Sequence, residues 1–312
     1  MRVLFMGTPK FAVNILEGLI NNYDVVGVVC QSDKEVGRKH ILTPCPVKEC
    51  ALNNNISVIQ PIKIKDDISS ILELDPDLIV TCAYGQVVPK EILDYPKYGC
   101  INVHASLLPK YRGGAPIHRS IINGESETGI TIMYMDEGLD TGDIISQESI
   151  KIEDDDNLET LSNKLSVLGT KLLLNTIPLI IAGKNTRIVQ DEKLVTYAKN
   201  ISPEDEHIDF NKSSLDVYNL IRGLSPNIGA YFLLDGERFK VYKAKIGTNK
   251  IGVREISIYK DSIGIGCSDF EILLLEVQPM GKKKMDIKSY LNGINKEEFK
   301  KREIRWRKVL IV

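Results

Sequence analysis

The residues best suited to chemistry lie in one stretch near the middle of the chain, residues 101–116. Asn102 and His104 stand two residues apart at the end of an apolar run that predicts a β-strand, so both side chains should leave the same face of a sheet. In an open parallel sheet, ligands bind beyond the carboxyl ends of the strands. The Leu108-Pro109 step and the Gly113-Gly114-Ala115-Pro116 sequence predict a rigid, tight loop around that point.

A second polar stretch, residues 135–143, follows an expected strand and is rich in carboxylates and glycines. An Asn, a His and an Asp brought together are suited to acyl transfer. Asn102 can donate to a developing oxyanion, His104 can hold or move a proton near neutral pH, and Asp140 can orient the imidazole. No Ser or Cys stands in an elbow motif, which favours direct transfer to an external nucleophile over a covalent enzyme intermediate.

Each of these residues also has a structural explanation. A histidine at a strand end is more often structural than catalytic, and Asn102 can cap the following turn. Asp140 can form a turn or bind calcium, although Asp136, Asp140 and Asp143 are too few and too widely spaced for an EF-hand loop. The residue types alone leave these alternatives open.

The elements that must position these residues alternate between short apolar runs and amphipathic stretches through the first half of the chain. This βαβ alternation predicts a doubly wound, mostly parallel sheet with helices on both faces, a Rossmann-like α/β domain. The expected strands are 2–6, 25–30, 57–59, 78–83, 99–103 and 129–134, and the expected helices are 11–21, 47–53, 66–74, 116–123 and 158–182, the last interrupted at Pro178.

The pattern changes after a polar stretch, residues 199–207, which we interpret as a linker. An expected helix at 213–224 precedes five short runs separated by Gly and Asp turns, which predict a small closed or half-closed β-barrel. These expected strands are 230–234, 238–244, 253–259, 262–267 and 270–277. We therefore expect one domain over residues 1–203 and a second over residues 204–312.

Composition indicates a folded, two-domain protein. The chain has 312 residues, 43% of them hydrophobic and 26% charged, which excludes a disordered or fibrous protein. The six cysteines show no CxxC pair and no metal-like spacing with histidine, so we expect no metal and a reducing compartment. The N-terminus opens a strand at once, without a signal-peptide layout, and no apolar run approaches a membrane span. We expect a soluble cytoplasmic protein without membrane contact.

The near-neutral net charge of −2 hides an uneven distribution. Residues 1–203 carry 20 Lys and Arg against 26 Asp and Glu, whereas residues 204–312 carry 20 against 16. Within residues 282–308 the excess is 11 against 4. A basic half joined to an acidic half indicates a polyanionic partner, although a solvated charged tail explains the same numbers.

The motifs resemble those of the folate-dependent formyltransferases. The resemblance rests on Asn102-x-His104-x-Ser106-Leu107-Leu108-Pro109, on Arg112-Gly113-Gly114-Ala115-Pro116 and on Asp140-Thr141-Gly142. Further segments resemble the methionyl-tRNA formyltransferases, and the resemblance covers residues 1 to about 302. These segments are Gly7-Thr8-Pro9-x-Phe11-Ala12, Leu42-Thr43-Pro44-x-Pro46-Val47-Lys48, the folate-pocket loop at 83–89 and the stretch 277–285.

The resemblance implies a function and a set of site residues. It implies that Asn102, His104 and Asp140 are catalytic, that 10-formyltetrahydrofolate is the formyl donor, and that initiator methionyl-tRNA is the acceptor. It also implies a C-terminal OB-like barrel that binds tRNA, with no metal, and we expect a monomer. The folate site would include Ser106, Leu107, Leu108, Pro109, Gln86, Val87 and Val88, and the tRNA contacts would include Arg38, Lys39, Lys282, Lys283 and Lys284.

Three positions depart from the family pattern. The tRNA-contacting loop usually reads Gly-Arg-Gly followed by two basic residues, and here it reads Gly37-Arg38-Lys39-His40, one residue short. Pro226-Asn227-Ile228-Gly229 stands where many members have Pro-Trp-Pro-Gly, a change expected to alter barrel packing rather than chemistry. His118 stands where Gln is more usual, and we interpret it as a helix-surface residue.

Three other functions share part of these features. Glycinamide ribonucleotide formyltransferase has the central motif but is a shorter single-domain enzyme, which leaves the residues after about 205 unexplained. Sugar N-formyltransferases share the motif and the approximate length, but a nucleotide-linked amino sugar does not require the basic tail at 282–308. An RNA-binding module with an inert first domain would not require Asn102, His104 and Asp140 together.

Overall fold

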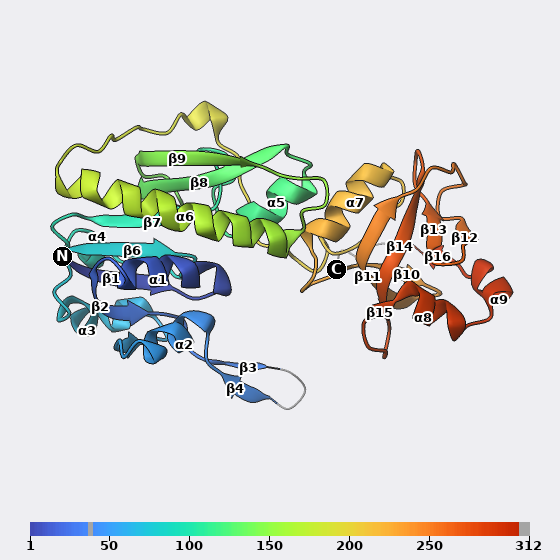
Figure 1. Cartoon of the computed structure of the whole chain (residues 1–312), viewed down its shortest axis with the longest axis horizontal. Coiled ribbons are helices and arrows are strands. Elements are labelled where there is room, and N and C mark those ends of the chain that lie inside the picture. Colours follow the sequence, from blue (N-terminus) through green and yellow to red (C-terminus); the bar gives the residue numbers. More distant parts are fainter. Residues whose placement is uncertain (37–39, 306–312) are drawn as a thin grey trace, which may run out of the picture. The chain divides into compact units, whose positions relative to one another are not determined.

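The structure is a computed structural model, and it describes residues 1–36 and 40–305 (Figure 1). The chain divides into two compact units. The first, here the N-terminal unit, comprises residues 1–116, 127–151 and 162–199, and the second, the C-terminal unit, comprises 117–126, 152–161 and 200–312. Because both units combine separate stretches of chain, the domains expected at 1–203 and 204–312 stay a prediction.

The N-terminal unit is built on a seven-stranded sheet in the order β5-β2-β1-β6-β7-β8-β9. The strands are β1 (Arg2–Gly7), β2 (Asp24–Val29), β5 (Val58–Ile59), β6 (Leu78–Cys82), β7 (Cys100–His104), β8 (Glu127–Tyr134) and β9 (Ile144–Lys151). Neighbouring strands from β5 to β7 are parallel, and β8 and β9 are antiparallel to their neighbours. The expected mostly parallel α/β sheet is confirmed. Strand β9 was not expected, because only its first two residues are fully apolar and buried.

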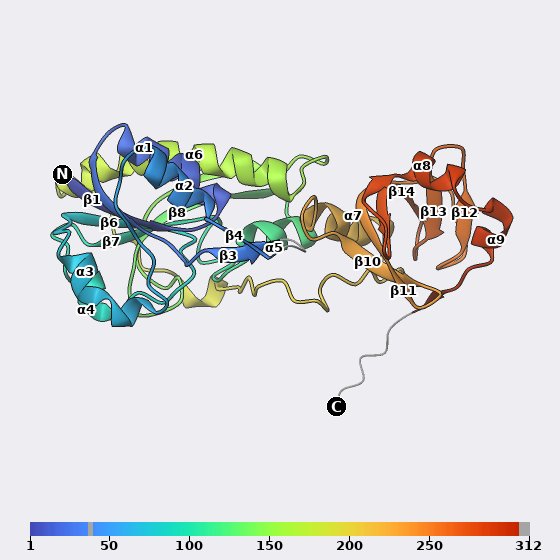
Figure 2. The ribbon, with the colours of Figure 1, turned by 90° about the horizontal axis from the view of Figure 1, so that it is seen from below.

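Helices cover both faces of this sheet, as expected. Figure 2 shows α1 and α6 on one side and α3 and α4 on the other. The helices of this unit are α1 (Val13–Ile20), α2 (Pro46–Asn53), α3 (Ile68–Leu72), α4 (Lys90–Leu93) and most of α6 (Leu158–Ile181), with 3-10 turns η1 (Lys10–Ala12), η2 (Ile64–Asp66) and η3 (Glu192–Leu194). Helix α5 (Pro116–Ile122) belongs almost entirely to the C-terminal unit. Pro46 opens α2, where its missing N–H has no helical partner to lose.

A short hairpin, β3 (Lys34–Val36) and β4 (Ile41–Thr43), precedes α2. Sequence patterns did not predict it, because each strand has only three residues. The predicted tRNA contacts Arg38 and Lys39 fall between its strands and lie outside the described residues.

Helix α6 runs through Pro178 and ends three residues later, so the expected interruption at Pro178 is wrong. A proline this close to the end disturbs only the last turn. Among the described residues α6 is the one helix long and apolar enough to cross a membrane. No such segment was predicted from the sequence. Of the most apolar stretch of α6, 44% is buried inside the protein.

One core cluster of the N-terminal unit lies between the sheet and the two helices α3 and α4. Leu4 and Met6 of β1 and Ile79 of β6 pack there against Ile71 of α3 and Ile92 of α4, and all five are fully buried. Burying side chains of this size contributes roughly 1.5–3 kcal/mol each. The loops that follow β6 and β7 carry the chemical motifs.

The C-terminal unit is an antiparallel half-barrel in the order β12-β13-β14-β11-β10-β16, with β15 paired to β14. The strands are β10 (Ala230–Leu234), β11 (Glu237–Ile246), β12 (Ile256–Ile258), β13 (Ile263–Gly266), β14 (Glu271–Pro279), β15 (Met285–Asp286) and β16 (Ile304–Arg305). Helices α7 (Ser214–Gly223), α8 (Ile287–Asn292) and α9 (Lys296–Lys300) accompany them. The five expected strands and α7 are confirmed, whereas α8, α9, β15 and β16 were not expected.

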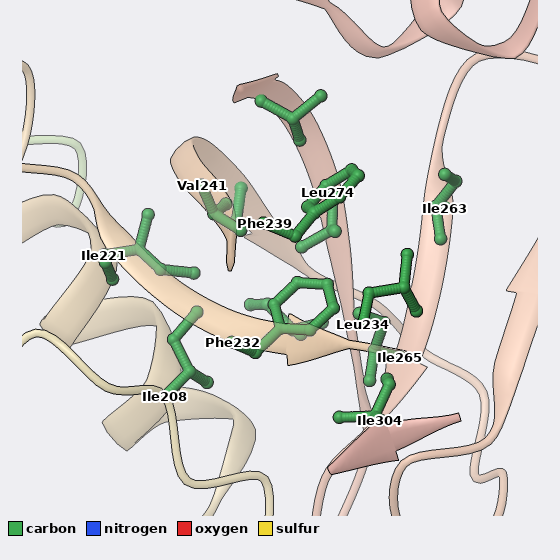
Figure 3. Close-up of a cluster of buried hydrophobic side chains, with 14 of the residues drawn as sticks. Ile208, Ile221, Phe232, Leu234, Phe239, Val241, Ile263, Ile265, Leu274 and Ile304 are labelled. Atoms are coloured by element: carbon green, nitrogen blue, oxygen red, sulfur yellow. The ribbon is translucent and has the colours of Figure 1, made fainter. Parts of the chain in front are cut away.

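The core of the half-barrel is mostly aliphatic, with aromatic rings packed among the aliphatic side chains (Figure 3). The ring of Phe232 packs edge-on against Phe210 and lies 5.2 Å, centroid to centroid, from Phe239. Phe239 in turn meets Tyr290 of α8 edge-on at 5.4 Å. Truncating a buried ring of this kind to alanine costs about 3–5 kcal/mol. These ring contacts therefore explain why α8 packs on the sheet.

The polar stretch interpreted as a linker is held within the C-terminal unit. Asp205 accepts two hydrogen bonds from the Arg119 guanidinium, at 2.7 and 3.0 Å. These bonds, together with the backbone N–H of Ser202, lower the pKa of the Asp205 carboxyl to about 2. Residues 199–207 are thus anchored, although their composition is that of a linker.

Candidate active site

The ends of β7 and β8 bring the three predicted catalytic side chains together. The carboxylate of Asp140 lies 3.6 Å from Nδ1 of His104 through Oδ2 and 3.4 Å from Nδ2 of Asn102 through Oδ1. All three residues belong to the N-terminal unit. The expectation that Asn102 and His104 share one face of the sheet is confirmed, because both side chains reach the same carboxylate.

His104 is 5% exposed, and its two ring nitrogens have different partners. Nε2 lies 3.0 Å from the carbonyl oxygen of Tyr111. A carbonyl only accepts, so Nε2 must carry a proton and donate it. The Nδ1 edge faces Asp140 at 3.6 Å, which is too long for a hydrogen bond. Nε2 is thus engaged by the Tyr111 carbonyl, whereas the Nδ1 edge faces the Asp140 carboxylate.

Asn102 is oriented by Thr81, a residue that was not predicted from the sequence. The hydroxyl of Thr81, on β6, donates to Oδ1 of Asn102 at 2.9 Å. With the oxygen held there, the Nδ2 amide group points toward Asp140. Thr81 lies in an apolar run, where one threonine carries no sequence signal, and only the pairing of β6 with β7 brings it to Asn102.

Asp140 is fixed by its backbone as well as by its side chain. Its φ is 53°, in the left-handed region that only a few residue types tolerate, and the Gly113 N–H donates to Oδ2 at 2.8 Å. The carbonyl of Asp140 accepts from the side chain of Gln190 at 2.9 Å. Gln190 was also missed by the sequence reading, since a single glutamine in a polar stretch shows no pattern.

The predicted folate segment, Ser106–Pro109, continues directly from β7. Thr131 of β8 ties it down, accepting from the Leu108 N–H at 3.1 Å and donating to the Ser106 carbonyl at 2.6 Å. The Ser106 hydroxyl donates to the Lys110 carbonyl at 2.7 Å. Ser106 and Leu108 are buried, whereas Leu107 and Pro109 are partly exposed.

The other predicted folate residues, Gln86, Val87 and Val88, follow β6, the strand next to β7. Gln86 accepts from the Ile64 N–H at 2.9 Å, and Val87 is 82% exposed. Val88 is buried in the core cluster. A pocket of about 320 Å³ adjoins this loop, lined by Lys63, Ile64, Lys65, Gln86, Val87 and Pro89.

The predicted tRNA lysines lie in the C-terminal unit, just after β14. All three are exposed, but they differ in their contacts. Lys284 is paired with Glu276 at 3.1 Å and lies 4.7 Å from the ring centroid of Tyr242. Lys282 lies 5.8 Å from the Tyr290 ring, and no ion pair is recorded for Lys282 or Lys283 within the described part of the chain. Lys282 and Lys283 are thus the more available of the three.

Two further features bear on what else the N-terminal unit could bind. A larger pocket, of about 550 Å³, lies between α1 and α6 and is lined by residues such as Glu17 and Lys171, none of which belongs to the site. Within residues 1–36 and 40–305 we find no group of three His, Cys, Asp or Glu side chains placed to hold a metal ion.

Comparison with known proteins identifies the family. The Formyl transferase family matches residues 1–177, and the Formyl transferase, C-terminal domain, family matches residues 200–295. A methionyl-tRNA formyltransferase of Staphylococcus epidermidis is 50% identical over 299 residues, covering 94% of this chain and 96% of that protein. The methionyl-tRNA formyltransferase of Bacillus subtilis is 49% identical over 303 residues, covering 95% and 96%.

Solved structures agree with the fold. The N-formyltransferase from Helicobacter canadensis has a TM-score of 0.64 at 24% identity, covering 89% of this chain and 98% of its own. The methionyl-tRNA formyltransferase from Clostridium thermocellum has a TM-score of 0.56 at 20% identity, covering 81% and 96%. At these identities the likeness supports the fold alone, so the family follows from the full-length relatives. This chain belongs to the methionyl-tRNA formyltransferase family.

Proposed function

We propose that this enzyme transfers the formyl group of 10-formyltetrahydrofolate to the free amino group of methionine on initiator methionyl-tRNA. The product is formylmethionyl-tRNA, which serves translation initiation. One observation carries the proposal. The chain is about 50% identical to methionyl-tRNA formyltransferases over almost its full length, and its Asn102 and His104 side chains both face the carboxylate of Asp140.

The reaction needs an oxyanion site and a route for one proton. The methionyl nitrogen attacks the formyl carbon and forms a new C–N bond, and the carbonyl oxygen becomes negative in a tetrahedral intermediate. The Asn102 Nδ2 group, whose orientation Thr81 holds, would donate to that oxygen. Protonated His104 would donate to the same oxygen through its Nδ1 edge, since Nε2 is occupied by Tyr111.

Collapse of the intermediate breaks the bond between the formyl carbon and the folate nitrogen. The amine loses a proton and the departing nitrogen gains one, so the step balances without a further reactant. Asp140 would hold the imidazolium and assist this transfer, because its carboxylate lies 3.6 Å from Nδ1. The separation of 3.6 Å leaves room for small movements as the substrates enter.

The folate donor would bind at the edge of the sheet where β6 and β7 end. The loop with Gln86, Val87 and Val88 and the segment Ser106–Pro109 follow these neighbouring parallel strands, so both begin at the same edge. The exposed side chain of Val87 offers apolar contact to the folate. We propose these segments as the folate site.

The tRNA would contact the C-terminal unit through phosphate charges, with Lys282 and Lys283 contributing more than Lys284. Arg38 and Lys39 are also proposed contacts, although they lie outside the described residues. A planar guanidinium at Arg38 suits phosphate better than an ammonium does. We propose that the enzyme acts as a monomer in the cytoplasm.

The decisive experiment compares two acceptors in one assay. Purified enzyme and 10-formyltetrahydrofolate are incubated either with charged initiator tRNA or with a nucleotide-linked amino sugar. We expect formylation of the charged tRNA alone. Formylation of the amino sugar alone would overturn the proposal in favour of a sugar N-formyltransferase, and binding of tRNA without transfer would favour an RNA-binding protein.

A further inference from the structure

We propose that Gln190 is a positioning residue for this reaction: together with Arg112 it holds Asp140 in the conformation that the catalytic trio needs. The inference rests on the proposed function. It starts from a buried set of hydrogen bonds that links three separate stretches of the N-terminal unit, at residues 112–113, 140–142 and 190.

The partners of Gln190 fix the orientation of its amide. Nε2 donates to the carbonyl of Asp140 at 2.9 Å and to the carbonyl of Gly142 at 2.8 Å. Oε1 accepts from Nε of Arg112 at 3.0 Å. Carbonyls only accept and a guanidinium only donates, so the opposite amide orientation would lose all three bonds. Gln190 is 6% exposed, and water offers little replacement.

Arg112 connects this amide to the rest of the site. Its side chain is 2% exposed, and its other nitrogens meet Glu192 at 2.8 and 3.4 Å. The next residue is Gly113, whose N–H donates to the Asp140 carboxylate. Asp140 is therefore held at both ends, at its carboxylate by Gly113 and at its carbonyl by Gln190, and Arg112 joins the two holds.

The hold matters because Asp140 has an unusual backbone. A φ of 53° costs free energy, and Asp140 keeps this conformation only because neighbouring contacts compensate for that cost. The loop also packs closely against the end of β8 at Gly142, because a Cβ there would lie 2.0 Å from the carbonyl oxygen of Tyr134. If the carbonyl of Asp140 lost its partner, the peptide could rotate, and the carboxylate would move relative to Nδ1 of His104.

A movement of about 1 Å is enough to lower a rate about 100-fold when the groups must be aligned. Gln190 touches neither the imidazole nor the amide of Asn102 in any recorded contact, so its effect would pass through Asp140. This predicts a loss in kcat rather than in binding.

The main test is the Gln190→Met variant, which keeps the length of the side chain and removes its hydrogen bonds. We expect kcat for formyl transfer to fall about 10–100-fold, with KM for folate and for charged tRNA changing less than about threefold. The pH profile of kcat should shift by about half a pH unit or more, because the surroundings of His104 change. Wild-type kcat and an unchanged pH profile in a folded variant would overturn the inference.

The matched control is Thr176→Val. The Thr176 hydroxyl is also buried and makes two bonds, to Leu172 and Ser146, at 2.7 Å each. We expect this variant to lose stability and to keep kcat within about twofold. If kcat in both variants falls in proportion to Tm, Gln190 is merely structural.

Two further measurements keep the test decisive if Gln190→Met does not fold. Gln190→Leu removes all three bonds with a shorter side chain and places no charge against the carbonyls of Asp140 and Gly142, so it should fold and still show the kcat loss. In an Asp140→Asn background, Gln190→Leu should lower kcat by less than about threefold more, since Gln190 acts through Asp140. Fully additive losses would overturn the inference. A wild-type enzyme without formyl transfer would instead overturn the proposed function.

Discussion

Two regions of the molecule present their polar groups in opposite ways. One is the edge of the N-terminal sheet around Asn102, His104 and Asp140, here the catalytic edge. The other is the turn of Lys282–Lys284 after β14, here the lysine turn. At the catalytic edge, His104 and Gln190 are buried, and each polar atom of the Gln190 amide has a fixed partner. At the turn after β14, Lys282 and Lys283 are exposed and have no recorded ion pair among the described residues.

The difference reflects two kinds of recognition. Acyl transfer needs donors held in fixed positions about 3 Å from the developing charge, so the site holds its side chains through buried hydrogen-bond partners. Binding of a polyanion needs charge near many phosphates, which mobile lysines supply through the release of counterions. Substitutions should therefore act sharply on turnover in the first region and gradually on affinity in the second.

The largest effect is expected from His104→Ala. Removing the imidazole deletes both the Nδ1 donor and the bond to the Tyr111 carbonyl. We expect turnover to fall by about 10²–10⁴ while the fold stays intact. Single-turnover formylation, with circular dichroism as the control for folding, measures this. Near-normal turnover would remove His104 from the mechanism and return it to a structural role.

Asp140→Asn should be next in size. The carboxylate now accepts from Gly113 and faces Nδ2 of Asn102, both of which are donors. An asparagine amide would place an NH₂ group against one of them and would remove the charge beside His104. We expect kcat to fall about 10²–10³-fold and folate affinity to change much less. A variant that binds folate poorly yet turns over normally at saturation would assign Asp140 to binding.

The lysine turn should give a smaller and graded effect. The double variant Lys282→Gln, Lys283→Gln should reduce the slope of log affinity against log salt by the amount expected for the loss of roughly one to two phosphate contacts. It should weaken the binding of many tRNAs alike, because phosphate contacts carry no sequence information. Lys284→Gln should change it less, because Lys284 is already paired with Glu276. Filter binding between 50 and about 200 mM salt tests this. Equal slopes for all variants would make the turn an ordinary solvated surface.

Most of the fold could be predicted from the sequence, because hydrophobic periodicity reports buried faces directly. The five buried barrel strands and the parallel strands β1, β2, β6 and β7 all fall within the expected ranges or within a few residues of them. The hairpin β3–β4, strand β16 and helix α9 were missed since each is only two to five residues long. Elements so short show no period.

The proximity of Asn102, His104 and Asp140 could also be predicted, because the spacing of Asn102 and His104 on one strand and the motif around Asp140 are local. Thr81 and Gln190 could not. Each acts through hydrogen bonds to residues distant in the sequence: Asn102 lies 21 positions from Thr81, and Asp140 lies 50 positions from Gln190. Such pairs exist only once the strands and loops have been assembled.

His118, expected on a helix surface, does lie on a helix but is only partly exposed there. It is half-buried on α5, and burial, with a smaller contribution from the adjacent Arg119, lowers the pKa of its imidazole to about 4. It is therefore neutral in the folded protein near pH 7. No recorded contact links it to the catalytic trio.

This burial predicts a small, pH-dependent effect on stability. Between pH 6.5, the ordinary pKa, and pH 4, the unfolded chain binds a proton at His118 that the folded chain does not. The free energy of unfolding should therefore fall as the pH drops through this window and level off, for this group, below it. His118→Gln, the residue more usual at this position in the family, should remove that part of the slope and leave kcat unchanged. Urea denaturation of both proteins at several pH values between 4 and 7 measures the difference, and identical slopes would mean that protonation of His118 does not contribute.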